Sequence, residues 1–259
     1  MLKVDHVCLE FDGLKAVNDV SLKVEKGSVT ALIGPNGAGK TTLFNIIAGV
    51  YTPKSGDIYL EGKNITGKKT FEICKEGIAR TYQVIKLFSG MTVLENVLVG
   101  MHSRMNAGFW QGVFRTKKTR EEEKAALKKA HELLELVGLE KYAQFPAGSL
   151  AYGQQRLLEI ARALASDPKL LLLDEPAAGM NSTEKMELNE RIRAMTKMGV
   201  TVLIVEHDMA MVMSIADKIY VINSGKYLAE GTAEEIANNQ EVIEAYLGRV
   251  MSDGAFADC

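Results

Sequence analysis

The residues with the clearest chemistry lie in a glycine-rich stretch near the N-terminus. Residues 34–41 match the phosphate-binding pattern G-x-x-x-x-G-K-[ST]. Glycines let such a loop fold with its backbone N–H groups toward phosphate oxygens, and the following helix adds the positive end of its dipole. Lys40 places a charge near the outer phosphates, and the Thr41 hydroxyl is a ligand for Mg²⁺. As a residue of a surface loop, Lys40 is expected to contribute little packing. The residues predicted to hold the nucleotide are Gly34, Pro35, Asn36, Gly37, Ala38, Gly39, Lys40, Thr41 and Thr42.

Two carboxylates, Asp174 and Glu175, directly follow the apolar run of residues 170–173. Ligands bind at the carboxyl ends of buried parallel strands, so both side chains are expected beside the nucleotide. We predict that Asp174 holds Mg²⁺ and that Glu175 polarises the attacking water as a general base. His207 follows a second apolar run, residues 200–205, and is predicted to lie near the γ-phosphate as a further catalytic residue.

The elements that must position these groups can be predicted from hydrophobic patterns. A strand over Val29–Ile33 precedes the glycine-rich loop, and a helix over residues 41–48 follows it. The runs 170–173 and 200–205 are typical of buried parallel strands, and a helix over residues 182–198 connects them. Short strands near residues 56–60 and at the N-terminus predict a small antiparallel patch, and residues 219–229 predict a late hairpin.

Residues 91–165 are predicted to form a helical subdomain inserted into the α/β chain. Thr92 and Glu95 fit a capping box at a helix start, and further helices are predicted over residues 121–137 and 153–165. Residues 101–119 are predicted to form a loop or mobile insertion, and the tail 251–259 is predicted to fray. The residues predicted to share one face of the 121–137 helix are Leu127, Ala130, Leu133, Leu134 and Val137.

Composition excludes several classes of protein. The 259 residues include 31 basic and 33 acidic ones, and the net charge of −2 argues against a strongly polybasic binder of nucleic acid or membrane surfaces. Three cysteines, Cys8, Cys74 and Cys259, are an odd number at scattered spacing, so we expect no disulfide framework and a reducing compartment. No apolar run approaches the ~20 residues that span a bilayer, and the N-terminus has no charged-then-apolar pattern of a signal peptide. We therefore expect it to dock onto a membrane protein at most.

The order of the motifs resembles one known family. Residues 149–156, Ser-Leu-Ala-Tyr-Gly-Gln-Gln-Arg, head a predicted helix. Together with the phosphate loop, Gln83, the Asp-Glu pair and His207, this segment resembles the nucleotide-binding domain of ABC transporters over nearly the whole chain. The Leu-Ala-Tyr-Gly variant, the run Glu-Pro-Ala-Ala-Gly-Met-Asn and the ending at residues 242–248 look most similar to the LivG-like ATP-binding subunits of branched-chain amino acid importers.

The resemblance implies one domain over residues 1–259 of the α/β class. Its P-loop NTPase (RecA-like) core, with a mainly parallel sheet and an N-terminal antiparallel β subdomain, would comprise residues 1–90 and 166–259. The resemblance also implies that ATP and Mg²⁺ are the cofactors, that Phe11 stacks on adenine, and that Gln83 reaches Mg²⁺ and the water and couples to the membrane partner. The segment that would cap the ATP of a second chain supplies Leu150, Gly153 and Gln154.

Two residues depart from the pattern of the family. Ala151 stands in place of the usual serine and Asn181 in place of the usual aspartate, and both changes affect contacts expected across a dimer. The implied partners are membrane permease subunits, a second ATP-binding subunit and, indirectly, a solute-binding protein, with the chain at the cytoplasmic face of the cell membrane. The second ATP-binding subunit could be an identical copy or a related chain, and we prefer the related chain in the complete transporter.

Other functions remain as alternatives. A subunit for lipopolysaccharide export shares much of the pattern, although Leu-Ala-Tyr-Gly argues against it. A soluble ATPase acting on nucleic acid or ribosomes would carry two motor units or a long coiled-coil insertion. A regulator without activity would be expected to lack Glu175 or His207. The basic run of residues 115–120 is followed at once by three glutamates, so we expect a solvated helix entrance and no nucleic-acid partner.

Overall fold

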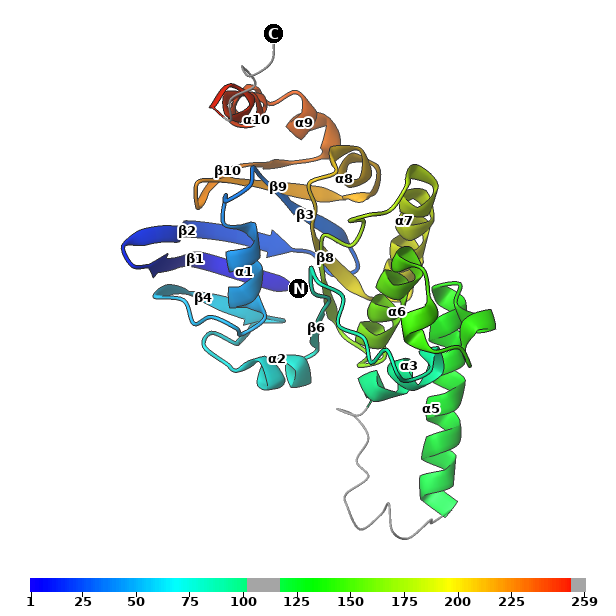
Figure 1. Cartoon of the computed structure of the whole chain (residues 1–259). Helices are drawn as coiled ribbons and strands as arrows, with labels where there is room; N and C mark the ends of the chain where they lie inside the picture. Colours follow the sequence, from blue (N-terminus) through cyan, green and yellow to red (C-terminus); the bar gives the residue numbers. More distant parts are fainter. Residues whose placement is uncertain (102–116, 253–259) are drawn as a thin grey trace.

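The strands of the chain form two sheets (Figure 1). The structure is a computed structural model that describes residues 1–101 and 117–252. An antiparallel sheet has the order β2-β1-β4-β5, and its strands are β1 (Leu2–Phe11), β2 (Leu14–Val24), β4 (Ser55–Leu60) and β5 (Lys63–Asn64). The second sheet has the order β10-β9-β3-β8-β7-β6, and its strands are β3 (Val29–Ile33), β6 (Ile78–Arg80), β7 (Leu170–Asp174), β8 (Thr201–Val205), β9 (Lys218–Asn223) and β10 (Lys226–Gly231).

The second sheet is parallel except at one edge. Strands β9, β3, β8, β7 and β6 run parallel, and β10 pairs antiparallel with β9 as the predicted hairpin. The predicted α/β class, with a mainly parallel sheet and an antiparallel sheet near the N-terminus, is therefore confirmed. Strand β3 has its predicted bounds, whereas β7 extends by one residue to include Asp174.

Nine helices lie within the described residues, and most of them connect strands of the six-stranded sheet. The helices are α1 (Lys40–Ile47), α2 (Thr70–Glu76), α3 (Val93–Met101), α5 (Lys117–Leu136), α6 (Tyr152–Leu164), α7 (Ser182–Lys197), α8 (Met209–Ile215), α9 (Ala233–Ala237) and α10 (Gln240–Ser252), with short 3₁₀ turns at Glu140–Tyr142 and Ala147–Ser149. The hairpin, the helix after the phosphate loop and the helix between β7 and β8 thus lie close to their predicted positions.

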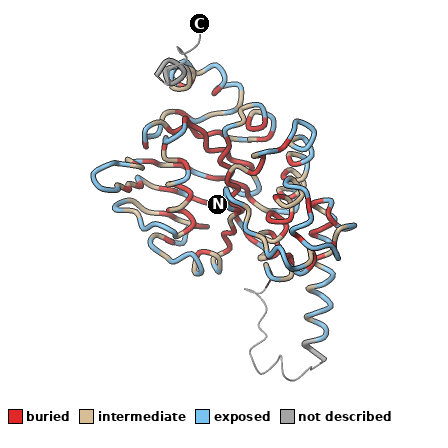
Figure 2. Tube along the Cα trace, viewed as in Figure 1, coloured by how far each residue is buried: buried red, intermediate tan, exposed pale blue. Residues whose placement is uncertain are grey.

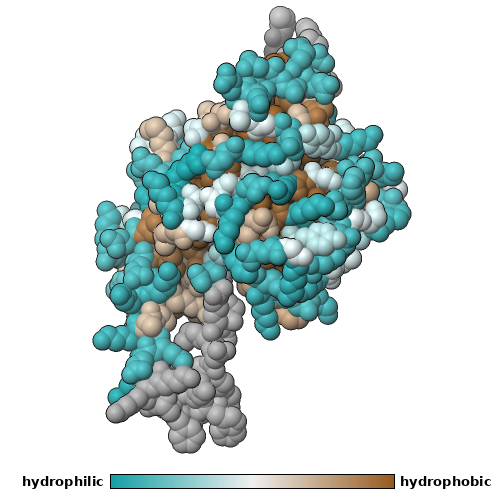
Figure 3. Space-filling view, turned by 180° about the vertical axis from the view of Figure 1, so that it is seen from behind, coloured by the Kyte–Doolittle hydropathy of each residue, from teal (hydrophilic) through white to brown (hydrophobic). Residues whose placement is uncertain are grey.

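Two hydrophobic clusters lie on opposite faces of the six-stranded sheet (Figure 2). Along β3, Ala31 and Ile33 belong to the cluster with helices α3, α5, α6, α7 and α8, and Leu32 belongs to the cluster with α1 and the antiparallel sheet. This alternation is the period of two expected of a strand buried on both faces. Seen from behind, hydrophobic side chains show mainly in gaps between hydrophilic ones (Figure 3).

The helical segment between β6 and β7 differs from expectation at one end. Four of the five residues predicted to share one face of the 121–137 helix are buried, although Val137 lies just beyond the end of α5, and Leu127 is 43% exposed. The N-terminal part of α5 projects beyond the other described helices (Figure 1), and most of residues 120–127 are exposed. Helix α5 starts at Lys117, inside the predicted loop of residues 101–119, and residues 102–116 lie outside the described residues.

The remaining predictions concern the C-terminal tail, the cysteines and membrane-spanning helices. Of the predicted fraying tail, residues 251–252 close α10, and residues 253–259 lie outside the described part of the chain. Cys8 and Cys74 carry free thiols, in agreement with the expectation of no disulfide framework for these two residues. None of the helices in residues 1–101 and 117–252 is long and apolar enough to span a membrane.

The parallel strands bring distant parts of the sequence to one edge of the sheet. Asp174 at the end of β7 pairs in register with Val205 at the end of β8, and Leu32 of β3 pairs with the same Val205. The phosphate loop, the Asp-Glu pair and His207 follow directly after these strands. The fold therefore places all three predicted motifs at the same carboxyl edge.

Candidate functional site

The glycine-rich loop connects β3 to α1 in a form that only glycine fits at two positions. Gly34 has φ +153° and Gly39 has φ +99°, and an added Cβ would lie 2.0 Å from the Ile222 carbonyl oxygen or 2.3 Å from that of Ala16. Helix α1 begins after Gly39 without a capping side chain and without an acidic residue in its first turn. Its start therefore presents backbone N–H groups and the positive end of the helix dipole.

The side chain of Lys40 lies inside this loop. It is only 8% exposed, and its Nζ donates to the carbonyl oxygens of Gly34 at 2.7 Å and Pro35 at 3.0 Å. The expectation of a surface lysine with little packing is therefore wrong. The loop folds around the ammonium because carbonyl oxygens replace the water that the buried charge loses.

A cavity of about 570 Å³ joins the loop to two other predicted residues. Residues Asn36, Gly37, Ala38, Gly39, Lys40, Thr41 and Thr42 line it together with Phe11 and Glu175. The Phe11 ring is 42% exposed and packs edge-on against Tyr51, with 5.2 Å between the ring centroids. An exposed aromatic ring at one end and an anion-binding loop at the other suit a molecule with a flat base and a phosphate chain.

The two carboxylates after β7 have different surroundings. The Asp174 side chain is 2% exposed, and its Oδ2 accepts from Nη2 of Arg80 at 2.8 Å. Glu175 has a left-handed backbone with φ +45°, and its N–H donates to the Val205 carbonyl at 2.9 Å. This sparsely populated conformation turns the chain sharply and points the Glu175 side chain into the cavity.

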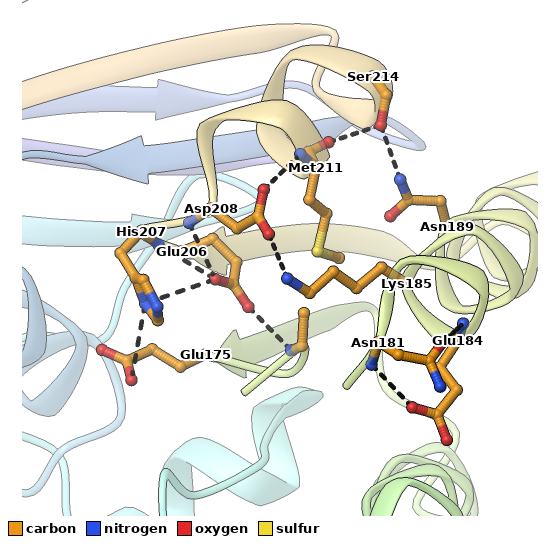
Figure 4. A network of polar contacts seen from close by, with 11 residues as sticks. Glu175, Asn181, Glu184, Lys185, Asn189, Glu206, His207, Asp208, Met211 and Ser214 are labelled. Atoms are coloured by element: carbon orange, nitrogen blue, oxygen red, sulfur yellow. Dashed lines mark hydrogen bonds and ion pairs between the residues drawn. The ribbon is translucent and has the colours of Figure 1, made fainter. Parts of the chain in front are cut away.

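Gln83 and His207 both approach one oxygen of Glu175. Gln83 Nε2 donates to Glu175 Oε2 at 3.2 Å, and His207 Nδ1 lies 4.0 Å from the same oxygen (Figure 4). The second distance exceeds a hydrogen bond, and His207 Nδ1 also lies 3.8 Å from Glu206 Oε2, with the His207 side chain 61% exposed. Two side chains from distant parts of the sequence thus meet at the carboxylate of Glu175.

Glu206 is a residue of this region that sequence reasoning missed. It is 1% exposed, and its carboxylate accepts from the backbone N–H groups of Ala177 at 2.8 Å and His207 at 3.1 Å (Figure 4). The buried carboxylate therefore connects the turn after Glu175 to the turn that carries His207. Its signal in the sequence was a carboxylate directly after an apolar run, the same signal that identified Asp174.

An ion pair holds the turn that leads from His207 into α8. Lys185 of α7 pairs with Asp208, which also caps α8 by accepting from the Met211 N–H at 3.0 Å. The ammonium of Lys185 lowers the pKa of the Asp208 carboxyl, and Asp208 raises the pKa of Lys185.

The segment with Leu150, Gly153 and Gln154 lies apart from the cavity of the phosphate loop. Helix α6 begins after Ala151, which has no side-chain acceptor, and Gln154 Oε1 accepts from the Ala151 N–H at 3.1 Å. Gly153 and Gln154 line a separate cavity of about 250 Å³ between α6 and α7, and Leu150 is buried. The structure therefore does not bring this second helix start to the phosphate loop of the same chain.

A buried ion pair on α6 holds the loop that carries Gln83. Arg156 is fully buried and donates from Nη1 to the Tyr82 carbonyl and from Nη2 to the Gln83 carbonyl at 2.8 Å. Its partner Glu159, at 2.8 Å, accepts a long hydrogen bond from the Tyr82 N–H at 3.4 Å. Burial raises the pKa of the Glu159 carboxyl, and the charge of Arg156 opposes that shift.

The chemistry of the three predicted ligands fits Mg²⁺: Thr41 lines the cavity, and Asp174 and Gln83 lie next to its lining residue Glu175. Hydroxyl, carboxylate and amide oxygens are available from Thr41, Asp174 and Gln83, and these are hard ligands. Within residues 1–101 and 117–252, no group of three or more His, Cys, Asp or Glu side chains could hold a metal by itself.

A groove of about 450 Å³ opens on the other side of the Gln83 loop, lined by residues of α2, β6, α3 and α6. Tyr82 and Arg80 are among its lining residues, and the ring of Phe88 and the side chain of Val99 give it apolar walls. The loop of Gln83 therefore lies between this groove and the cavity that contains Glu175.

Comparisons with known proteins agree with this geometry. Residues 17–178 match the family model described as ABC transporter, and residues 228–250 match the model described as branched-chain amino acid ATP-binding cassette transporter. The high-affinity branched-chain amino acid transport ATP-binding protein BraF of Pseudomonas aeruginosa is 49% identical over 249 residues, covering 96% of this chain and 98% of that protein.

Solved structures show the same fold. The ADP conformation of an ATP-binding cassette of an ABC transporter has a TM-score of 0.84 at 35% identity, over 96% of this chain and 98% of that one. A dimeric ATP-binding cassette bound to ADP and Pi has a TM-score of 0.74 at 26% identity, over 90% of this chain and 99% of that one.

Proposed function

This chain belongs to the ABC transporter family as an ATP-hydrolysing motor subunit, and we propose that it drives the import of branched-chain amino acids. The solute is supported by the family model at residues 228–250 and by the name of the relative from Pseudomonas aeruginosa. Both observations favour import of branched-chain amino acids over the alternative of lipopolysaccharide export.

The single observation that carries the catalytic proposal is the meeting of Gln83 and His207 at Glu175 beside the phosphate loop. Glu175 takes a proton from the attacking water as general base, and Gln83 and His207 orient the water and the γ-phosphate. Phe11 stacks on adenine, and the loop amides with Lys40 hold the phosphates.

The proposed metal ligands are Thr41, Asp174 and Gln83. Mg²⁺, when bound, neutralises charge on the β- and γ-phosphate oxygens. The protein contributes the orientation of these three side chains, and the burial of Asp174 fixes its carboxylate at the end of β7.

We propose that two motor subunits pair head to tail. The start of α6 is an anion site with no phosphate near it in its own chain, and Leu150, Gly153 and Gln154 would complete the ATP site of the partner. The dimeric relative bound to ADP and Pi supports this arrangement. An identical copy and a related chain would both satisfy it.

The groove beside the Gln83 loop is the proposed docking site for a permease subunit. Its walls are apolar, and its floor includes Tyr82, whose neighbour Gln83 contacts Glu175. A helix of the permease in this groove would place the chain at the cytoplasmic face of the membrane. We propose residues 91–165 as the helical subdomain, because α3, α5 and α6 fall within this range and pack against one another.

The test is transport by a reconstituted complex. The chain would be assembled in liposomes with the permeases, the second motor subunit and the binding protein encoded beside it. Leucine, isoleucine and valine are expected to be taken up and to stimulate ATP hydrolysis, and glutamate and histidine are not. A complex with Glu175→Gln is the control without hydrolysis. Uptake of none of the three branched-chain amino acids by an ATP-hydrolysing complex would overturn the solute assignment.

A further inference from the structure

Arg80, the last residue of β6, lies directly behind the carboxylate proposed to hold the metal. Its side chain is 9% exposed, and Nη2 donates to Asp174 Oδ2 at 2.8 Å. Arg80 does not line the nucleotide cavity, and although it stands three residues before Gln83, the sequence indicates no role of its own for it. Because Arg80 and Asp174 are 94 residues apart, only the pairing of β6 with β7 brings them together.

The guanidinium of Arg80 is held on several sides. Nη1 donates to Asn45 Oδ1 of α1 at 2.6 Å, and Cζ lies 5.8 Å from the centroid of the Phe44 ring and 5.5 Å from that of Tyr82. The Nε atom is buried without a hydrogen-bond partner among the described residues. A group fixed by the helix after the phosphate loop and by two rings cannot follow Asp174 if that side chain rotates.

This fixed pairing defines the orientation of the Asp174 carboxylate. Oδ2 is engaged by Arg80, so Oδ1 is the carboxylate oxygen that this ion pair leaves for a metal. Carboxylates that bind metals are themselves hydrogen-bonded by outer partners, and loss of such a partner costs about 10–100-fold in metal affinity or activity. An isolated buried ion pair, by contrast, is weak evidence for stability, so stability alone does not explain why an arginine is kept here.

We propose that Arg80 is a positioning residue for the metal, which holds Asp174 in the orientation that binds Mg²⁺ beside the nucleotide. The proposal rests on the proposed function, because it assumes that Asp174 is a metal ligand. Asn45 belongs to the same device, since it fixes the other side of the guanidinium. The charge is not sufficient, because a lysine is a single point charge, whereas the planar guanidinium donates to Asp174 Oδ2 and to Asn45 Oδ1 at once.

The test separates metal binding from nucleotide binding in the full-length protein. Arg80→Met, Arg80→Lys and Asn45→Ala would be compared with wild type in two titrations. The first is ADP affinity in the presence of EDTA, where no metal is bound. The second is the affinity of the ADP-saturated protein for Mn²⁺, followed by the electron paramagnetic resonance signal of free Mn²⁺. Arg191→Met is the matched control, because Arg191 is a partly buried arginine that pairs with Glu187 away from the cavity.

Arg80→Met is expected to bind ADP in EDTA within about twofold of wild type and to bind Mn²⁺ about 10–100-fold more weakly. Arg80→Lys and Asn45→Ala are expected to lie between Arg80→Met and wild type, and Arg191→Met is expected to match wild type. If Arg80→Met does not fold, the two milder variants decide the matter. Wild-type Mn²⁺ affinity in the folded Arg80 variants would overturn the role of Arg80 alone. Wild-type protein that binds neither ADP nor Mn²⁺ would overturn the proposed function as well.

Discussion

Helices α1 and α6 begin in the same chemical condition but in different surroundings. Neither has a capping side chain, since α1 starts after Gly39 and α6 after Ala151. By contrast, α7, α8 and α9 begin at Asn181, Asp208 and Thr232, whose side chains each accept from the helix backbone. A capping side chain is worth about 0.5–2 kcal/mol, so the two open starts forgo stability at places where an anion could supply the missing partner.

The surroundings of the two starts explain why they are different halves of one site. Helix α1 follows a loop that wraps the Lys40 ammonium, and the cavity in front of it also contains Phe11 and Glu175. Helix α6 follows no loop that wraps a lysine ammonium among the described residues, and Gly153 lines a separate cavity. One chain therefore holds nearly all of a nucleotide site. The start of α6 would contribute to a site only when it faces the phosphate loop of a second chain. Four experiments can break or sharpen this comparison.

The largest effect is expected from Glu175→Gln. The amide keeps the shape of the side chain but removes the base, so hydrolysis should fall by about 10²–10⁴-fold. Bound ATP should then persist and the dimer should accumulate, which light scattering or gel filtration with Mg·ATP would detect. Glu61→Gln, at a surface ion pair with Lys169, is the control for loss of a carboxylate. A monomer at saturating ATP would argue against a homodimer and favour a mixed pair with a related chain.

Lys40→Ala tests the half of the site that the phosphate loop and the start of α1 form. Removing a charged donor to the phosphates should lower hydrolysis by about 10²–10³-fold, and ATP binding measured by calorimetry should weaken with it. Because Lys40 is buried and bonded to two loop carbonyls, we also expect a small loss of melting temperature, and circular dichroism should show an unchanged fold. Normal hydrolysis by a folded Lys40→Ala protein would contradict the assignment of the loop.

Mixing two inactive variants tests whether the halves belong to different chains. Gly153→Asp places a negative charge at the start of α6 and should repel the partner's phosphate without weakening ATP binding by the single chain. In a mixed dimer of Lys40→Ala and Gly153→Asp, one site combines both defects and the other has neither. The mixture should therefore regain hydrolysis that each variant lacks alone. No recovery, with mixed dimers demonstrated by two affinity tags, would place both halves in one chain.

The phosphate loop was predictable because its signal is local. Strand β3, the glycines and the start of α1 are consecutive in the sequence, and each is specified by its own residues. The position of Asp174 and Glu175 was also predictable, because an apolar run of the length of β7 leaves the next residues at the edge of the sheet. The structure places these predicted residues side by side, and their chemical roles stay predictions.

The buried charges that support the site had no local signal. Arg80 lies 94 residues before Asp174, and Arg156 lies 73 residues after Gln83. A lone arginine in a sequence is most often exposed, and only the packing of β6 against β7 and of α6 against the Gln83 loop shows that these two are not. Glu206 does have a local signal, because it directly follows an apolar run. Its neighbour His207 has the more common catalytic side chain, so the sequence favours His207 at this position.

The smallest effect is expected from Ala151→Ser, and it tests the open start of α6 directly. A serine at this position can accept from the backbone N–H of Gln154, which is the third residue of the helix. If the start is open in the single chain, this cap should stabilise the nucleotide-free protein by about 0.5–2 kcal/mol. For a chain of this size, each kcal/mol corresponds to about 2–4 °C in melting temperature.

Asn181→Ala is the matched opposite, because it removes an existing cap from α7, where Asn181 Oδ1 accepts from the Glu184 N–H at 3.0 Å. Its melting temperature should fall by a similar amount. Calorimetry of both variants without nucleotide, under the same buffer, measures the two changes against each other. A fall for Asn181→Ala with no rise for Ala151→Ser would mean that the backbone N–H groups at the start of α6 gain nothing from a capping side chain. The resemblance between the two open helix starts would then be lost, and α6 would need another reason to bind a partner's phosphate.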